Sequence, residues 1–402
     1  MTKTLQHRVI AELGEERLRN AVYCWGPEGE TIVAWGRRML QWPLASGANY
    51  REVAPTAPGL WYSNGGCALD VDGDGFDEIV VARAQDPNDA EPVLVWFKPT
   101  DGSWQEHVAA EIGGPSGTSP HDVLPFSAQR PTGETLRGVV AVLGRKRLVW
   151  YQIPPDPKQP WIPHEIGELP ADTAQSGLAI GHFSGTLTGK LSGAAAETMA
   201  GDKSANKRPD LACGLFWAEC PADPTREPWT IRRFSDWRNE GWSGMAKLVA
   251  ADFDGDGLDE LAVAEAEIPG ARLAVFKRNP ADPDGLWMSH PLDQGLYCPH
   301  SAVALDVDGD GRLDLVVGEM TAGGWSFPLN PSPKLYLYTN RGGLRFERRI
   351  LQEGVGMHEL KLAPRRDRTE ALLYAADEIQ PQKFSGMNTV VSCWTWRDGD
   401  AE

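Results

Sequence analysis

Three nearly identical acidic segments carry the residue types with the clearest chemistry. They are Asp70–Glu78, Asp252–Glu260 and Asp306–Asp314. Each segment places carboxylates at positions 1, 3, 5 and 9, and the residue at position 7 can offer its backbone carbonyl. Oxygen ligands gathered on a tight loop suit a hard cation such as calcium. Because three matching copies favour metal loops over acidic turns without a metal, the sequence predicts three structural calcium sites.

Glycine at position 6 of each segment permits the sharp turn that such a loop needs. The expected ligands are Asp70, Asp72, Asp74, the carbonyl of Phe76, and Glu78 in the first loop; Asp252, Asp254, Asp256, the carbonyl of Leu258, and Glu260 in the second; and Asp306, Asp308, Asp310, the carbonyl of Arg312, and Asp314 in the third.

These loops do not read as EF-hands, which need a glutamate at position 12 and a helix on each side. Position 12 is Val81, Val263 or Val317, and each loop is followed by a short apolar run of the kind that forms a buried strand. Each loop is therefore expected to join two strands.

Degenerate copies of the same pattern recur along the chain and define a repeat. The units start near residues 20, 64, 121, 176, 246, 300 and 358, and each is followed by further strand-like runs. Seven units of four antiparallel strands predict an all-β, seven-bladed β-propeller that spans residues 1–402 as a single domain.

The last unit contains only three strand-like runs and ends with Thr389–Trp396. A matching fourth run stands at the other end of the chain, at residues 5–10. We expect this N-terminal strand to join the last blade and close the ring, because closure removes an exposed sheet edge.

The Asp-x-Asp-Gly-Asp-Gly loop with its following apolar strand resembles the calcium-binding FG-GAP or VCBS-type repeats, over residues 5 to about 397. The Trp-x-x-His opening of outer strands, as in Trp104–His107, and the histidines before inner strands look more like carbohydrate-active propellers. These include rhamnose–glucuronate lyases, ulvan lyases, a related rhamnosidase group and the propeller of aldos-2-ulose dehydratase. The resemblance implies a carbon–oxygen lyase or dehydratase that acts by β-elimination on a small sugar or a uronate-containing oligosaccharide, with a rhamnosidase-type glycosidase as the alternative.

The histidines divide by position. His7, His107, His164 and His290 fall in outer strands and are expected to pack there, whereas His182 replaces the first aspartate of a degenerate loop. His121, His300 and His358 stand at the starts of inner strands, where a propeller opens its central funnel. They could cap neighbouring blades, act as a general base, or hold an additional divalent metal in the funnel.

Further side chains are expected near the same funnel. Tyr297 is a candidate catalytic proton donor beside the three histidines, and the expected substrate-binding residues are Arg83, Arg145, Lys247, Asn64, Tyr62, Trp217, Glu265 and Glu319. An elimination needs a base, a cation for the developing negative charge and a proton donor. A glycosidase would instead use two carboxylates, which Glu265 and Glu319 could supply. A non-catalytic propeller that binds a glycan or a protein is the alternative of another class.

Composition limits the partners. Lys plus Arg is 39 and Asp plus Glu is 56, and the net charge of −17 argues against nucleic acid or an anionic membrane as a partner. The expected ligand is a small sugar or oligosaccharide. No secretion signal is visible at the N-terminus, so we expect a cytoplasmic protein unless a leader has been removed. The six scattered cysteines are expected to be reduced, buried thiols.

Overall fold

The computed structural model describes residues 3–45, 49–54, 59–85, 89–100, 103–170, 175–184, 208–238, 244–279, 281–321, 328–364, 370–377 and 389–398. Within these residues the strands form seven four-stranded antiparallel sheets. The predicted fold is thereby confirmed: the protein is an all-β, seven-bladed β-propeller with four antiparallel strands per blade. No helix long and apolar enough to cross a membrane occurs among the described residues.

Each blade is numbered here by the order of its first strand. Blade 1 comprises β2 (Leu18–Gly26), β3 (Gly29–Gly36), β4 (Met39–Pro43) and β5 (Arg51–Ala54). Blade 2 comprises β6 (Leu60–Leu69), β7 (Glu78–Gln85), β8 (Ala90–Thr100) and β9 (Ser103–Glu111). Blade 3 comprises β10 (Pro120–Gln129), β11 (Thr135–Leu143), β12 (Arg147–Gln152) and β13 (Ile162–Glu168).

Blade 4 comprises β14 (Leu178–Gly181), β15 (Asp210–Cys213), β16 (Phe216–Glu219) and β17 (Thr230–Arg233). Blade 5 comprises β18 (Ala246–Ala251), β19 (Glu260–Glu265), β20 (Pro269–Lys277) and β21 (Met288–Tyr297). Blade 6 comprises β22 (Ser301–Leu305), β23 (Asp314–Gly318), β24 (Lys334–Asn340) and β25 (Phe346–Glu353). Blade 7 comprises β26 (His358–Leu362), β27 (Leu372–Ala376), β28 (Val390–Asp398) and β1 (Lys3–Glu12).

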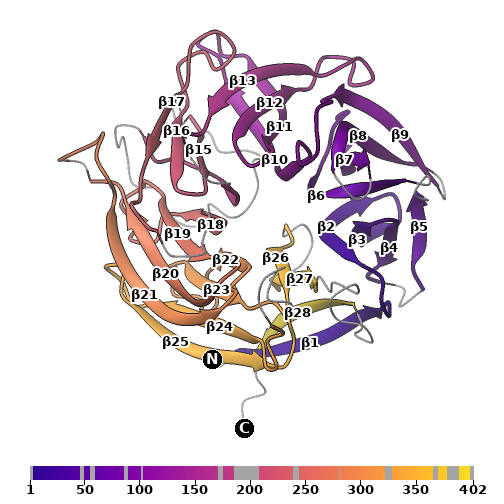
Figure 1. Ribbon diagram of the computed structural model, residues 1–402. Helices are drawn as coiled ribbons and strands as arrows, with labels where there is room; N and C mark the ends of the chain where they lie inside the picture. The colour runs from indigo at the N-terminus through magenta and orange to yellow at the C-terminus, as the bar shows by residue number, and fades with distance from the viewer. Residues whose placement is uncertain are drawn as a thin grey trace. The chain divides into compact units, whose positions relative to one another are not determined.

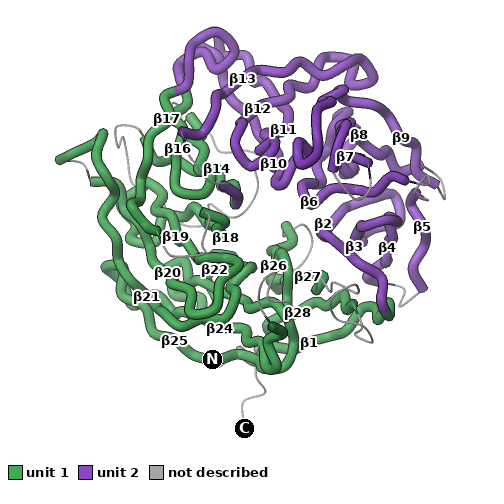
Figure 2. Tube along the Cα trace, viewed as in Figure 1, with its two compact units in different colours: residues 1–14, 177–220, 230–402 green, residues 15–176, 221–229 purple. Residues whose placement is uncertain are grey.

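The chain forms two compact units, which Figure 2 shows in different colours. One unit contains residues 1–14, 177–220 and 230–402 and therefore holds blades 4 to 7. The other contains residues 15–176 and 221–229 and holds blades 1 to 3. The first strands begin within a few residues of the predicted starts. The behaviour of the whole chain as a single domain stays a prediction.

The N-terminal strand completes the last blade, as predicted. β1 pairs antiparallel with β28 from Lys3 opposite Asp398 to Glu12 opposite Val390, and the two strands lie side by side in Figure 1. Two further backbone hydrogen bonds, Leu13 N to Thr389 O (2.9 Å) and Thr389 N to Gly14 O (2.8 Å), extend this contact. The backbone groups at the edge of β28 are therefore satisfied by the opposite end of the chain.

The second strand of a blade is buried on both faces, and its sequence explains why. All of Glu260–Glu265, Asp314–Gly318 and Leu372–Ala376 is buried. Continuous apolar runs suit a strand that is covered on both sides. Within the larger unit, Ala264 on the second strand of blade 5 shares a core cluster with Val317 on the second strand of blade 6, so neighbouring blades cover each other's second strands.

Side-chain hydrogen bonds near the acidic loops connect consecutive blades. Asp77 Oδ2 accepts a hydrogen bond from the backbone N of Trp25 at 2.7 Å, which ties blade 2 to blade 1. Asp259, at the same loop position in blade 5, accepts from the backbone N of His182 at 2.7 Å. In blade 6 this position is Leu313, and Asn340 instead donates to the carbonyl of Phe253 at 2.7 Å. These links fix each of the three acidic loops against the preceding blade.

A cross-strand tryptophan–histidine pair recurs in the outer half of three blades. Trp96 stacks on His107 with ring centroids 4.3 Å apart, Trp150 lies 5.0 Å from His164, and Trp394 lies 5.1 Å from His7. These contacts confirm the packing role expected for these outer-strand histidines. All six cysteines lie among the described residues, are buried, and form no disulfide, as expected.

Removal of β1 tests the closure of blade 7. A variant lacking residues 1–12 exposes the edge of β28 and uncovers Trp394 and Trp396, whose core cluster Leu5 contacts. We expect aggregation or a large loss of thermal stability, measured by size-exclusion chromatography and circular dichroism melting. Removal of residues 399–402, beyond β28, is the control and should change neither. A monomeric β1 deletion with an unchanged melting curve would contradict the pairing.

The outer-strand histidines that pack against tryptophans should make stability depend on pH. Burial lowers the pKa of His7, His107 and His164 below the ordinary value of 6.5. The unfolded chain then binds more protons than the folded chain just below that value, so the free energy of unfolding should fall as pH decreases through it. Denaturant titrations at about pH 8 and about pH 5.5 measure the loss. The triple variant His7→Phe, His107→Phe, His164→Phe should lose less, and an equal loss would refute this cause.

Candidate functional site

The three acidic loops have the same internal geometry. Each lies between the first and second strands of its blade, as predicted. The aspartate at position 1 accepts hydrogen bonds from the two glycines of the turn: Asp70 from Gly73 N (2.6 Å) and Gly75 N (3.0 Å). Asp252 and Asp306 make the matching pairs at 2.7 to 2.9 Å. All of these glycines have φ between 78° and 91°, a region that favours glycine.

The acidic residue at position 9 is the buried member of each loop. Glu78, Glu260 and Asp314 are at most 1% exposed, and each accepts a hydrogen bond from the backbone N of position 2 at 2.7 to 3.0 Å. Burial, with a contribution from the neighbouring aspartates, raises the pKa to about 8 for Glu78, about 7 for Glu260 and about 6 for Asp314. These buried carboxylates need a cation to be stable in their charged form.

Positions 1, 3 and 9 of each loop could hold a metal ion. One carboxylate oxygen from each of the three residues lies within 4.8 Å of the others in all three loops. The Oε1 atom of Glu78 is buried and has no hydrogen-bond partner in the described part of the chain. An all-oxygen donor set with an unsatisfied buried oxygen fits a hard divalent cation.

In two loops a lysine ammonium already compensates the acidic charge. Lys98 Nζ forms an ion pair with Asp72 and lies 2.6 Å from Asp74 Oδ2. Lys98 directly follows Phe97, which pairs with Ile79 at the start of the second strand, and this register places the lysine beside the loop. In blade 5, Lys277 bonds in the same way to Asp254 and lies 2.6 Å from Asp256 and 3.0 Å from Glu260. The third loop lacks this lysine, because Thr339 occupies the equivalent position.

A second cluster lies where the first strands of blades 5, 6 and 7 begin, within the larger unit. The rings of His300 and His358 stack with centroids 4.3 Å apart and an interplanar angle of 25°. Glu359 Oε1 lies 3.7 Å from His300 Nδ1 and also bonds to the ammonium of Lys247. His300 and His358 are 2% and 3% exposed, and Lys247 is 8% exposed. The structure thus brings together three of the residues predicted for the funnel.

Glu359 is held in an unusual backbone conformation. Its φ is 59°, in the left-handed region, and it lies in a β-bulge between His358 and Lys361. Burial raises the pKa of Glu359, but the charges of Lys247, His358 and His300 outweigh this effect and hold the pKa well below its ordinary value. A buried anion is therefore maintained at this point by its cationic neighbours.

In the smaller unit, His121 forms a dyad with its neighbour in sequence. His121 Nδ1 lies 2.9 Å from Asp122 Oδ2, and the two side chains are 8% and 13% exposed. His121 is the extra residue of a β-bulge, because Pro120 pairs with Leu143 and Asp122 with Val142. Bulges often redirect a side chain beside an active site. The convergence of His121 with His300 and His358, which belong to the other unit, stays a prediction.

Four other residues of the smaller unit that were expected to bind substrate pack against, or bond to, neighbouring residues of the protein. Tyr62 is 2% exposed and packs edge-on against Phe97. Arg83 forms an ion pair with Glu106 at 2.7 Å. The carbonyl of Asn64 accepts a hydrogen bond from Asn20 Nδ2 at 2.7 Å. Arg145 lies in the hairpin after β11 with φ of 57°, and its carbonyl accepts from Gln175 N at 2.9 Å.

In the larger unit, the remaining residues expected at the funnel also make contacts within the protein. Trp217 is 1% exposed and packs against Phe183 and Trp287. Glu265 is fully buried and pairs with Arg272. Glu319 accepts hydrogen bonds from Tyr297 N (2.8 Å), Asn330 Nδ2 (3.1 Å), Lys334 N (3.1 Å) and the Tyr336 hydroxyl (3.3 Å). The Tyr297 hydroxyl donates to the carbonyl of Pro328 at 2.6 Å.

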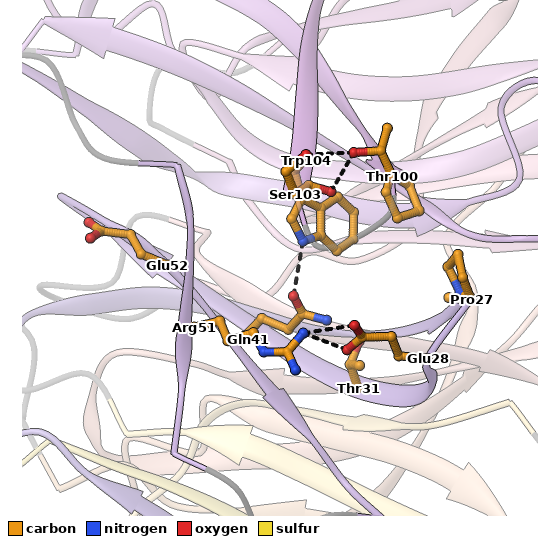
Figure 3. A pocket seen from close by; sticks show the side chains of 11 residues that line it. Pro27, Glu28, Thr31, Gln41, Arg51, Glu52, Thr100, Ser103 and Trp104 are labelled. Carbon is orange, nitrogen blue, oxygen red and sulfur yellow. Dashed lines mark hydrogen bonds and ion pairs between the residues drawn. The ribbon is translucent and has the colours of Figure 1, made fainter.

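A pocket of about 220 Å³ lies between blades 1 and 2 (Figure 3). Its polar groups bond to one another: Trp104 Nε1 donates to Gln41 at 2.9 Å, and Arg51 pairs with Glu28. No residue predicted for the site lines this pocket. The pocket is therefore separate from the residues that the sequence predicts for the funnel.

Sequence reasoning missed the residues that complete the two clusters. Lys98 and Lys277 stand on third strands, far in sequence from the loops they contact, and only the repeated hairpin register indicates their proximity. Glu359 directly follows His358 in the sequence, but a glutamate in the left-handed region leaves no local sequence signal. Asp122 was recognisable as the neighbour of His121, and the structure places it in hydrogen-bond contact.

Comparison with known families supports the repeat assignment. The FG-GAP repeat matches residues 299–328, a segment that includes His300, strands β22 and β23, and the acidic loop between them. None of the curated proteins compared with the chain matches it. The protein therefore has a propeller fold with an FG-GAP repeat.

Proposed function

We propose that this propeller is a carbon–oxygen lyase or dehydratase that acts by β-elimination on a small sugar or a uronate-containing oligosaccharide. The observation that carries the proposal is the His121–Asp122 dyad on its β-bulge. An imidazole that donates Nδ1–H to a carboxylate presents the lone pair of Nε2, which can accept a proton at neutral pH.

In the proposed step, His121 Nε2 takes the proton from the carbon next to the substrate's carboxyl or carbonyl group. The electron pair of that C–H bond forms the new carbon–carbon double bond, and the neighbouring carbon–oxygen bond breaks. The leaving oxygen takes up a proton from the protonated His121, which restores the neutral base. Arg145 follows the strand that pairs with the start of β10, and its guanidinium is the candidate for holding the developing negative charge in the same blade.

A glycosidase is less well supported by the same contacts. Glu265 is fully buried in its pairing with Arg272, and Glu319 accepts four hydrogen bonds from its own chain. A glycosidase needs one carboxyl group to donate a proton and another to act on the sugar or on water. Because the oxygens of Glu265 and Glu319 are engaged in these contacts within the protein, both carboxylates are poor candidates for either role.

The burial of two residues expected to contact a sugar counts against a carbohydrate substrate at those positions and leaves a second candidate, a non-catalytic propeller that binds a protein or a glycan through other residues. Trp217 and Tyr62 are nearly inaccessible, so neither ring offers a face to a sugar. The two candidates differ in product formation. A new ultraviolet absorbance from an unsaturated product supports the lyase, whereas binding without a product across a wide panel of uronates and keto-sugars supports the binding module.

We further propose that the three acidic loops bind calcium as structural sites and that the protein acts in the cytoplasm without nucleic-acid or membrane partners. The calcium proposal draws on the all-oxygen donor sets and on the FG-GAP match over the third loop. The proposal on partners draws on the net charge of −17, and the proposal on location draws on the six cysteines, which are buried and form no disulfide.

Turnover by variants of blade 3 tests the catalytic proposal. We expect His121→Ala to reduce kcat by roughly 10² or more, because it removes the general base. Asp122→Asn should also reduce kcat while it preserves the shape of the side chain. His164→Ala, in the outer strand of the same blade, is the matched control and should keep its activity per folded molecule. Full activity in His121→Ala would refute the assignment, with circular dichroism as the folding control.

Calorimetric titration tests the calcium sites and the role of the lysines. Chelator should lower the melting temperature and calcium should restore it, because the ion binds only the folded chain. Lys98→Met with Lys277→Met should tighten calcium binding at two sites by roughly tenfold or more, since no ammonium has to be displaced. Lys334→Met, away from the loops, is the control. An unchanged affinity in the double variant would contradict the competition between lysine and calcium.

A further inference from the structure

We infer that His300, His358 and Glu359 form a binding site for a divalent transition metal, separate in position and chemistry from the acidic loops. The three residues each offer a ligand atom, and these atoms lie within 4.8 Å of one another. Two imidazoles and one carboxylate suit zinc, iron or cobalt and leave further coordination positions open. The site stands independently of the proposed elimination, since it concerns binding in the absence of substrate.

The burial of the two imidazoles is the first support. His300 and His358 are 2% and 3% exposed, and the stacked rings hold their nitrogens in one place. The Nδ1 atom of His300 is buried and has no hydrogen-bond partner among the described residues; its neighbour Glu359 Oε1 is 3.7 Å away. A buried nitrogen without a hydrogen bond is costly unless a ligand satisfies it. A metal ion between Nδ1 and the carboxylate supplies that ligand.

A second carboxylate lies where a metal-bound histidine requires one. Glu267 Oε1 is 3.4 Å from His300 Nε2, whereas Glu359 Oε1 lies near the other ring nitrogen, Nδ1. A histidine that binds a metal through one nitrogen commonly donates its other N–H to a carboxylate, which fixes the tautomer and the orientation of the ring. Glu267 is therefore assigned as a positioning residue that directs the lone pair of Nδ1 toward Glu359.

Backbone strain around the cluster is the third support. Glu359 and Cys298 have φ of 59° and 47°, although neither is a glycine. Glu359 is itself one of the three proposed ligands, and Cys298 comes two residues before His300 in the sequence. Left-handed conformations of such residues are costly and concentrate at ligand and active sites. Here the bulge at Glu359 turns its carboxylate toward His300.

Lys247 marks the position that a cation occupies. Its ammonium bonds to Glu359, as Lys98 and Lys277 bond to the aspartates of the acidic loops. Binding of a divalent ion to Glu359 therefore has to displace this ammonium. The affinity of the site should rise when the lysine is removed, an outcome that loss of a merely structural ion pair would not produce.

Cobalt titration of the full-length protein tests the site. The chelator-treated protein is first saturated with calcium, so that the acidic loops are occupied, and Co²⁺ is then added. We expect one tight site with intense visible absorption typical of nitrogen-ligated cobalt of low coordination number. His300→Ala or His358→Ala should weaken binding by roughly 100-fold, and Glu267→Gln by roughly 10-fold. Lys247→Met should strengthen it. His121→Ala, in the other unit, is the control and should bind as the wild type does.

Several outcomes would overturn the inference. Weak absorption typical of cobalt surrounded only by oxygen, or equal affinity in the wild type and in both histidine variants, would assign the ion to other carboxylates. Weaker binding in Lys247→Met would show that the lysine supports the site and does not compete for it. Because Glu267→Gln and Lys247→Met retain both histidines, they test the inference even where an alanine variant fails to fold.

Discussion

Buried carboxylates that need a compensating positive charge are the constraint on which the described architecture depends. The position-9 residues Glu78, Glu260 and Asp314 close their hairpins by accepting a backbone hydrogen bond, so they anchor the loop and the start of the second strand together. The same loops hold the links to the preceding blade, through Asp77 and Asp259. Charge compensation at the loop therefore stabilises both the hairpin and the contact between blades.

The first strand of blade 6 separates two kinds of chemistry. His300 precedes β22 and Asp306 follows it, and the six residue steps between them span about 20 Å in an extended strand. Oxygen ligands gather at the hairpin end, where turn geometry brings successive aspartates together. Imidazoles gather at the opposite end, where bulges and left-handed residues redirect side chains. A hard cation and a transition metal would thus be selected by different ends of the same strand.

The repeat made the fold predictable from sequence, because each acidic loop with its apolar run defines one hairpin and the other strands follow in order. The last unit contains only three strand-like runs, which predicted that the N-terminal strand supplies the fourth. The register of β1 and β28 confirms this prediction. Individual side-chain contacts were not predictable. Trp217 is buried by Phe183 and Trp287, which stand far from it in the sequence. Glu319 likewise accepts hydrogen bonds from groups on other strands, among them Tyr297 N and the Tyr336 hydroxyl. The lysines over the loops and the bulged Glu359 depend on register and backbone strain, which a single sequence does not encode locally.

The central claim is that each end of a first strand has its own ligand chemistry, oxygen at the hairpin and nitrogen at the strand start. An anomalous diffraction experiment at the cobalt edge, on crystals grown with calcium and cobalt, tests it most directly. We expect an anomalous cobalt peak bound by His300, His358 and Glu359, and calcium density without a cobalt signal in the loops beginning at Asp70, Asp252 and Asp306. Cobalt in the acidic loops with none at the histidines, or loops without any metal density, would contradict it.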